Sequence, residues 1–382
     1  MINQVATFLN TASKGILGTQ LVAGQNSTWV TYGNELVSSQ TNKDSFFKTL
    51  FNLIGESREL TKLYTKRFPT VYKNSIDYGT IMQTIDTDMV DLVPSDVVDV
   101  VDGKEYPYVV HKTTVRQKLF DNQVAYQLVY TMPSNKMIRL NFRDETAAAA
   151  FLNSIVTAMA NVITVAQQGL VQACVGNRIA HAIKFKESET NTLTAQNLLA
   201  IYNEKTNAGY TFANCLEKED FLSFVAETFN KDRERLGWIS SRYNEEGLDK
   251  HTADPRMILH ADVESALRFK LRSNTFNEFL VRIDGSYESV PYWQQSGLTY
   301  NFDDTSSIDY TIKYEDEEVN VKAKGILGIM FDEYALGCTL FYDEIRSAYN
   351  AQTDTTTYYR DIVEQYYNNL GENFVVYYIA EE

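Results

Sequence analysis

Cysteine and histidine are scarce in this 382-residue sequence, which has three cysteines and four histidines. Cys174, Cys215 and Cys338 lie far apart and form no CxxC pair, which excludes a disulfide framework or zinc site and suits a reducing, cytosolic history. No histidine has a second His or Cys at metal-ligand spacing. GxGxxG, GxxxxGK[ST] and GxSxG motifs are also absent. The sequence therefore predicts no catalytic residue, no metal site and no cofactor.

Charge is absent from residues 146–177, a stretch long enough to span a bilayer. Its polar residues recur at spacings of three and four, which places them on one stripe of a helix opposite an apolar stripe. Such a helix is expected to pack against protein on several sides, so we predict no membrane span. The polar stripe is Asn153, Thr157, Asn161, Thr164, Gln168 and Gln172, and the apolar stripe is Phe151, Ile155, Met159, Val162, Ala166 and Leu170.

Positive charge is in deficit, since the net charge is −15 and residues 302–382 carry five Lys and Arg against 17 Asp and Glu. Such a surface repels phosphate, which argues against direct nucleic-acid binding but suits a wall that encloses DNA without sticking to it. Basic residues gather instead between residues 62 and 118. We expect them to pair with the acidic C-terminal third of a neighbouring copy.

The hydrophobic patterns predict an α+β chain. Residues 1–42 are polar and predict an extended arm with little helix; a helix begins near Asp44 and ends near Gly55. A helix of about 40 residues is predicted from Arg143 to Ile183, with a break at Gly169 or Gly176. The remaining predictions are helices over 194–204 and 218–238, a strand over 257–260 with a helix from Asp262, a strand over 279–285, an acidic hairpin over 309–325 and a closing strand over 372–382.

Residues 75–118 predict a long two-stranded hairpin with a turn at Asp102-Gly103. The hairpin has no apolar face of its own, and an isolated hairpin is only marginally stable in water. We therefore expect it to lie on another copy of the chain. The candidate inter-subunit contact residues are Lys62, Lys66, Arg67, Lys73, Tyr78, Ile81, Lys112, Arg116, Lys118, Asn161, Gln168, Glu315, Asp316 and Glu317.

Asp332 and Glu333 lie between two apolar strands, where two carboxylates could be a catalytic pair, a metal site or a plain turn. No histidine or basic residue is near them in the sequence, so a turn with solvated charges is the prediction. The acidic run 316–318 is interpreted as a solvated hairpin tip. His260, at the end of a strand, is interpreted as capping the next helix.

The order of these parts resembles the major capsid proteins of tailed bacteriophages, which have the Hong Kong 97-type fold, and is most similar to those of small protein-primed podoviruses. "DSFFKTLFNLIG" resembles the helix after their N-terminal arm, "IDYGTIMQTI" the first strand of their extended loop, and "FLNSIVTAMANVI" the long spine helix of their peripheral domain. "GILGIMFDEYALGCTLFYDEIRSAYN" resembles the start of their closing segment. The lysine–asparagine cross-link of some relatives is not carried over, because no partner Asn or activating Glu matches.

The resemblance implies a division of the chain into an N-terminal arm and helix (1–55), a connection (56–74), an extended loop (75–118), a peripheral domain with the spine helix (119–190), an axial domain (191–345) and a return to the peripheral domain (346–382). It implies a virion protein, assembled in the host cytoplasm as hexamers and pentamers of an icosahedral or prolate head. Its expected partners are a separate scaffolding protein, since the chain has no room for a large cleaved scaffolding segment, a portal at one vertex and enclosed double-stranded DNA.

Two alternatives remain open. One is a cytosolic α+β enzyme or binding module that uses the acidic C-terminal third. The other is a different virion component, such as a portal or tail protein, against which the closing segment argues.

Overall fold

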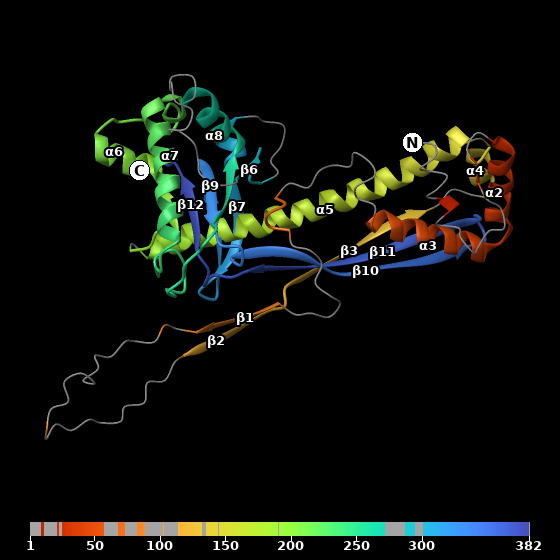
Figure 1. The fold of residues 1–382 in the computed structure, drawn as a ribbon, viewed down its shortest axis with the longest axis horizontal. Coiled ribbons are helices and arrows are strands. Elements are labelled where there is room, and N and C mark those ends of the chain that lie inside the picture. Colours follow the sequence, from red (N-terminus) through yellow and green to blue (C-terminus); the bar gives the residue numbers. More distant parts are fainter. Residues whose placement is uncertain are drawn as a thin grey trace.

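The computed structural model describes residues 9–10, 21–22, 25–56, 68–72, 82–87, 89, 102, 114–131, 135–143, 145–189, 191–271, 287–294 and 301–381. The molecule is elongated, with a compact α/β body at one end and a cluster of N-terminal helices at the other (Figure 1). Helix α5 (Glu145–Ser188) joins the two ends, and a hairpin projects from the body (Figure 1).

The compact body is built on a five-stranded sheet of order β4-β12-β9-β5-β6. Side chains of its central strand β9 alternate between two cores: Ile329 joins the core shared with α5, and Met330 joins the core beneath the helices. Strand β9 is buried along its whole length because both faces of the sheet are covered. The strands are β4 (Ala195–Asn197), β5 (Arg256–His260), β6 (Tyr287–Val290), β9 (Ile326–Phe331) and β12 (Phe374–Tyr378); the helices are α6 (Leu198–Thr206), α7 (Glu219–Leu236) and α8 (Ala261–Ala266), with short turns over Cys215–Glu217, Leu267–Leu271 and α10 (Phe302–Thr305).

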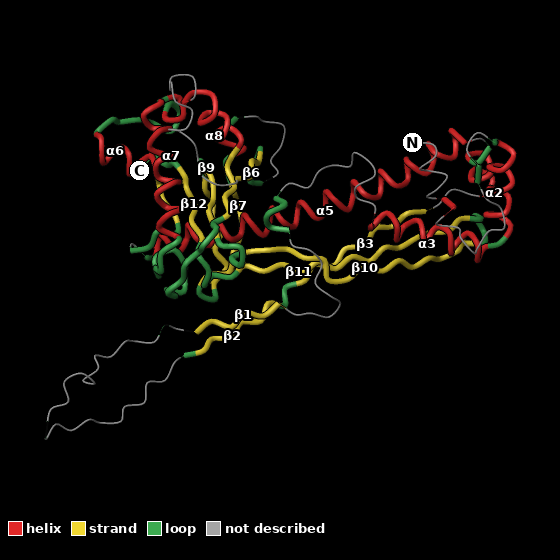
Figure 2. The backbone as a smooth tube through the Cα atoms, in the orientation of Figure 1, coloured by secondary structure: helices red, strands yellow, loops and turns green. Residues whose placement is uncertain are grey.

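A second sheet, of order β10-β11-β3, runs beneath α5 toward the N-terminal helices (Figure 2). Strands β10 (Leu336–Asn350) and β11 (Thr355–Asn368) are long, and β3 (Gln123–Thr131) pairs with β11. The N-terminal helices α2 (Asn26–Ser38) and α3 (Gln40–Glu56), together with α4 (Asn135–Asn141), close a separate core around Trp29 and Phe47. Two further hairpins pair β1 (Met82–Thr87) with β2 (Val115–Phe120) and β7 (Ile308–Tyr314) with β8 (Glu317–Ala323).

Helix α5 contributes to both of these ends, since Met159 packs among the N-terminal helices and Ile179 packs beneath the five-stranded sheet. Its 44 residues correspond to about 66 Å. The expected packing of this helix on several sides is confirmed, since both predicted stripes contain buried residues. Gln168 and Gln172 of the polar stripe are buried, whereas Val162 of the apolar stripe is 55% exposed. The neighbouring Gln167 is also buried, and its Nε2 donates to the hydroxyl of Tyr72, which donates to Glu364.

The two helix glycines predicted as breaks do not interrupt α5, and their surroundings differ. Apart from the adjoining helix backbone, no atom lies within 4 Å of where a Cβ would stand on Gly169, whereas a Cβ on Gly176 would collide with the ring of Tyr310. We expect Gly169→Ala to raise the free energy of unfolding by about 0.5–1 kcal/mol, since alanine favours helix. We expect Gly176→Ala to lower it by about 1–3 kcal/mol through overpacking. Urea unfolding of the two variants checks the opposite signs; equal effects would contradict this account.

Most predicted elements are confirmed: the helix over 44–55, the long helix, the helix over 218–238, the strand 257–260 with its following helix, the acidic hairpin and the closing strand. The prediction of little helix over 1–42 is wrong, because α2 forms where Trp29, Tyr32 and Leu36 bury one face. The segment over 194–204 begins as strand β4 before it becomes α6. The predicted strand over 279–285 lies outside the described residues.

Candidate assembly interface

The β1–β2 hairpin turns two different faces to its surroundings. Residues that pair across the strands point to the same face, so the register places Gln83 with Leu119, Ile85 with Gln117 and Thr87 with Val115 on one side. All six are exposed, and the three apolar side chains, Ile85, Leu119 and Val115, are 63%, 59% and 60% exposed. We call Ile85, Val115 and Leu119 the outer apolar face. The described part of the chain leaves this face uncovered. The prediction that the hairpin has no apolar face of its own is therefore wrong, because the register gathers these three side chains on one side.

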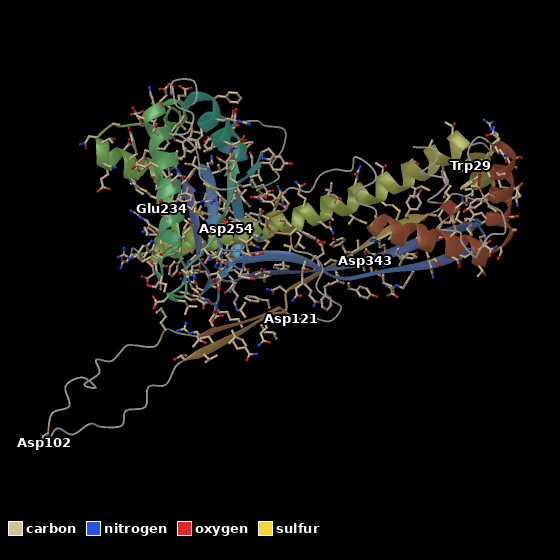
Figure 3. The ribbon with its side chains drawn as sticks, viewed as in Figure 1. Trp29, Asp102, Asp121, Glu234, Asp254 and Asp343 are labelled. Atoms are coloured by element: carbon tan, nitrogen blue, oxygen red, sulfur yellow. The ribbon has the colours of Figure 1, made fainter. Side chains whose placement is uncertain are left out.

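The opposite face of the hairpin is fixed to the body by charges. Asp86, which is only 6% exposed, binds the ammonium groups of Lys250 and Lys118. Lys118 also lies 2.7 Å from Glu246, and Lys250 lies 2.9 Å from Glu372. Because five alternating charges meet at this half-buried site, the base of the hairpin has a defined position. Asp102 lies far from the body (Figure 3).

The candidate contact residues fall into three groups. Arg116 is exposed and pairs in register with Asp86, so it lies on the face opposite the outer apolar face, and Lys118 of that face is held by carboxylates of its own chain. Asn161 is half-buried on α5, and Gln168 of the same helix is buried within its own chain. The remaining ones in the hairpin region lie outside the described residues: Lys62, Lys66, Arg67, Lys73, Tyr78, Ile81 and Lys112.

The acidic tip of the β7–β8 hairpin is the third group. Glu315 and Asp316 form its turn with left-handed backbone, φ 49° and 68°, and Glu317 begins β8. All three are exposed, and the nearest cation is Lys313, 2.9 Å from Asp316. A non-glycine residue with positive φ is uncommon, so this turn holds its carboxylates outward at some cost in backbone energy. The predicted solvated tip is confirmed.

The residues weighed for chemistry have structural roles. Asp332 accepts a hydrogen bond from the Tyr334 amide at 2.9 Å, and Glu333 pairs with Arg256 at 2.6 Å, which confirms a turn with solvated charges. His260 accepts from the Asp262 amide at 3.2 Å and so caps α8, as predicted. Within the described residues, no group of three or more His, Cys, Asp or Glu is placed to hold a metal ion. No helix in the same residues is long and apolar enough to cross a membrane.

A buried ion pair that the sequence did not reveal joins α5 to the loop after α7. Arg178 has no exposed surface and binds Glu245, which is 5% exposed, while the guanidinium lies 4.6 Å from the centre of the Phe374 ring. Burial raises the pKa of Glu245, although Arg178 opposes this rise. His181 lies 4.0 Å from the same carboxylate. Burial, assisted by Arg178, lowers the pKa of His181 to about 4, so the imidazole is neutral at pH 7.

The depressed pKa of His181 predicts a loss of stability in acid. Between pH 6.5 and pH 4 the unfolded chain binds a proton that the folded chain does not, so stability falls as pH falls. From pH 7 to pH 5 this costs about 2 kcal/mol. Urea unfolding at pH 7 and pH 5 should therefore show a smaller loss of unfolding free energy for His181→Gln than for the wild type. The raised pKa of Glu245 increases the free energy of unfolding as pH falls. Because wild type and His181→Gln share this effect, it cancels when their losses are compared. Equal losses in both would contradict the prediction.

Comparison with known proteins agrees with this architecture. The family model of the Phi29-like phage major capsid protein matches residues 5–378. The chain is similar to a protein in the capsid structure of Staphylococcus phage Andhra, with 12% identity, 84% of this chain and 86% of that chain covered and a TM-score of 0.54. A chain from the structure of head fiber and inner core protein gp22 of bacteriophage P68 matches with 10% identity, coverage of 84% and 86% and a TM-score of 0.49. A search of curated proteins found no match.

The family match covers nearly the whole sequence, and the Andhra similarity shows that the α+β fold is that of Hong Kong 97-type phage capsid proteins. The predicted shell-forming function is therefore confirmed, and the alternative of an enzyme in the acidic C-terminal third is wrong. The chain belongs to the Phi29-like phage major capsid protein family and is a structural, non-enzymatic component of the virion that assembles with copies of itself into the head shell.

Proposed function

We propose that the β1–β2 hairpin is the extended loop of this capsid protein and that its outer apolar face packs on a neighbouring copy in the shell. One observation carries this: Ile85, Val115 and Leu119 are each about 60% exposed, while the opposite face is fixed to the chain's own body. Burying the exposed part of such side chains contributes roughly 1 kcal/mol each. The contact repeats around a closed shell, so modest individual energies are sufficient.

The same proposal divides the chain as the Hong Kong 97-type organisation implies. Residues 1–55 form the arm and its helices, 56–74 the connection, 75–118 the extended loop, 119–190 the peripheral domain with α5 as its spine helix, 191–345 the axial domain and 346–382 the return. Two features supplement it. Strand β10 pairs with β11 from Leu336 onward, so the peripheral sheet begins before residue 346. Strand β12 lies in the five-stranded sheet, so we assign residues 374–378 to the axial unit instead of the return.

Charge provides a second set of contacts in this proposal. Arg116 and the basic residues at 62, 66, 67, 73 and 112 are expected to meet carboxylates of a neighbour, among them Glu315, Asp316 and Glu317 at the β7–β8 tip. Lys118 and Gln168 have partners or cover within their own chain, so they support the contact surface from beneath. Asn161 lies beside the exposed Val162 and Val165 on α5, and this strip is a further contact candidate.

We infer three further partners. A separate scaffolding protein guides the curvature of the shell during assembly in the host cytoplasm, and a portal occupies one vertex. Double-stranded DNA is enclosed without sequence-specific contacts, which suits a chain of net charge −15 because an acidic wall does not retain phosphate.

Electron microscopy of the chain expressed alone and with a candidate scaffold tests the proposal. We expect shells, partial shells or hexameric and pentameric rings, with the hairpin of each copy lying over its neighbour at high resolution. Shells in which Ile85, Val115 and Leu119 face solvent would overturn the proposed contact. A uniform monomer with and without scaffold would contradict self-assembly by this chain.

A further inference from the structure

The loop after α7, residues 237–250, which we call the Trp238 loop, has a fixed backbone. Ser240 and Lys250 exchange two backbone hydrogen bonds of 3.0 and 3.3 Å, and the Thr252 amide donates to the Leu236 carbonyl at 2.7 Å. Tyr243 is buried between these anchors. The Lys250 ammonium also binds Asp86 of β1, so the loop lies beside the base of the hairpin. The label Glu234 in Figure 3 marks the last turn of α7, after which this loop begins.

This fixed loop presents two large apolar side chains to solvent. Trp238 is 78% exposed and Ile239 is 57% exposed, whereas the other two tryptophans, Trp29 and Trp293, are fully buried. The core beneath the loop is closed by Leu236 without either side chain. An exposed tryptophan on a rigid support contributes nothing to this fold but is the residue type most enriched at the energetic centre of protein interfaces, where preorganisation limits the entropy lost on binding.

The charges around Trp238 and Ile239 favour a second copy of the chain as the partner of this surface. The sequence from Arg235 to Arg242 contains two arginines and no acidic residue, in a chain of net charge −15. Both arginines are exposed, although each has one partner in its own chain: Arg235 lies 3.2 Å from Asp232, and Arg242 donates to Asn191 at 3.1 Å. Their exposed guanidinium surface beside the apolar pair complements the acidic surface of another copy. DNA is the less favourable occupant, because two cations beside the exposed Glu234 and Asp249 form no phosphate-binding stripe.

We propose that Trp238 and Ile239 insert into a second copy of this chain and form an anchor of the subunit contact, with Arg235 and Arg242 facing carboxylates at its rim. This inference rests on shell assembly by the chain but not on the hairpin contact. The two contacts involve different side chains, so each can fail alone.

Tryptophan fluorescence tests the anchor in the full chain. Trp238 is the only one of the three tryptophans that acrylamide can reach in the unassembled chain. We expect the acrylamide quenching constant of assembled particles, separated by sedimentation, to be at least about fivefold lower than that of the unassembled chain. Trp238→Phe should remove the quenchable fluorescence of the unassembled chain. Unchanged quenching in particles would overturn the proposal. Protection that appears only on adding DNA would assign the surface to nucleic acid instead, and a wild-type chain that forms no oligomer at any concentration would also refute it.

Assembly concentration supplies a second measurement. We expect Trp238→Ala to raise the protein concentration needed for assembly at least about tenfold and Arg242→Glu to raise it in a salt-dependent way, both with unchanged circular dichroism. Trp238→Phe should recover part of the loss. Phe269→Ala, which removes an aromatic ring that is 70% exposed elsewhere, is the matched control. Assembly of Trp238→Ala at the wild-type concentration would refute the anchor, while a hairpin variant that assembles normally would refute only the hairpin contact.

Discussion

A chain that carries Ile85→Ser, Val115→Ser and Leu119→Ser is expected to fold as the wild type does and to form no shells. The three side chains are already exposed, so their replacement removes no packing within the subunit. At an interface they would lose roughly 3 kcal/mol per hairpin, about a hundredfold in the affinity of each contact. Because every copy in a shell has such a contact, the deficits accumulate. Circular dichroism with electron microscopy of the same preparations gives both readouts.

The matched control lies on the same face of the same strands. Gln83→Ser and Gln117→Ser shorten two exposed polar side chains of that face, so this variant should assemble normally. If the triple variant also forms ordinary shells, the outer apolar face is not a subunit contact. If it unfolds instead, the face belongs to the core of its own subunit, and our account of the hairpin is wrong.

Local patterns predicted elements whose side chains meet partners close in sequence. The acidic tip at Glu315 could be predicted because a hairpin depends on alternation and turn residues within a few positions. Helix α5 could be predicted because its spacing persists over 44 residues. Helix α2 was missed because its N-cap Gln25 makes no capping hydrogen bond, its first turn has no acidic residue and its last turn has no basic residue. Its one sequence indication is the spacing of Trp29, Tyr32 and Leu36.

Environment could not be predicted in the same way. Spacing shows that the polar residues of α5 share a stripe, but not that the neighbouring Gln167 would meet Tyr72, which in turn donates to Glu364. The family resemblance identified an assembly protein, yet which face of the hairpin is free depends on Asp86 meeting Lys250, 164 residues away. Long-range pairs of this kind leave no periodic pattern in a single sequence.

Arg178→Met is expected to cause the largest loss of stability, about 3–5 kcal/mol in the free energy of unfolding. Removing the guanidinium leaves Glu245 with a buried charge and no cation, in a loop whose other end carries Trp238. The loss should shrink at lower pH, because Glu245, with its raised pKa, then takes up a proton. Urea unfolding at pH 7 and pH 5 measures both effects. The exposed pair Lys231–Glu227 is the control, since Lys231→Ala should change stability by less than about 1 kcal/mol.

The double variant Arg178→Met with Glu245→Leu separates the two explanations of that loss. If an uncompensated charge is the cause, replacing both partners by apolar side chains should recover most of the stability, because two desolvated charges are then absent. If the double variant is as unstable as Arg178→Met, the packing of the guanidinium on Phe374 is the cause instead. Recovery of stability without recovery of assembly would show that the ion pair has a second role: it holds residues 237–250 in the one conformation that presents Trp238 to the next copy.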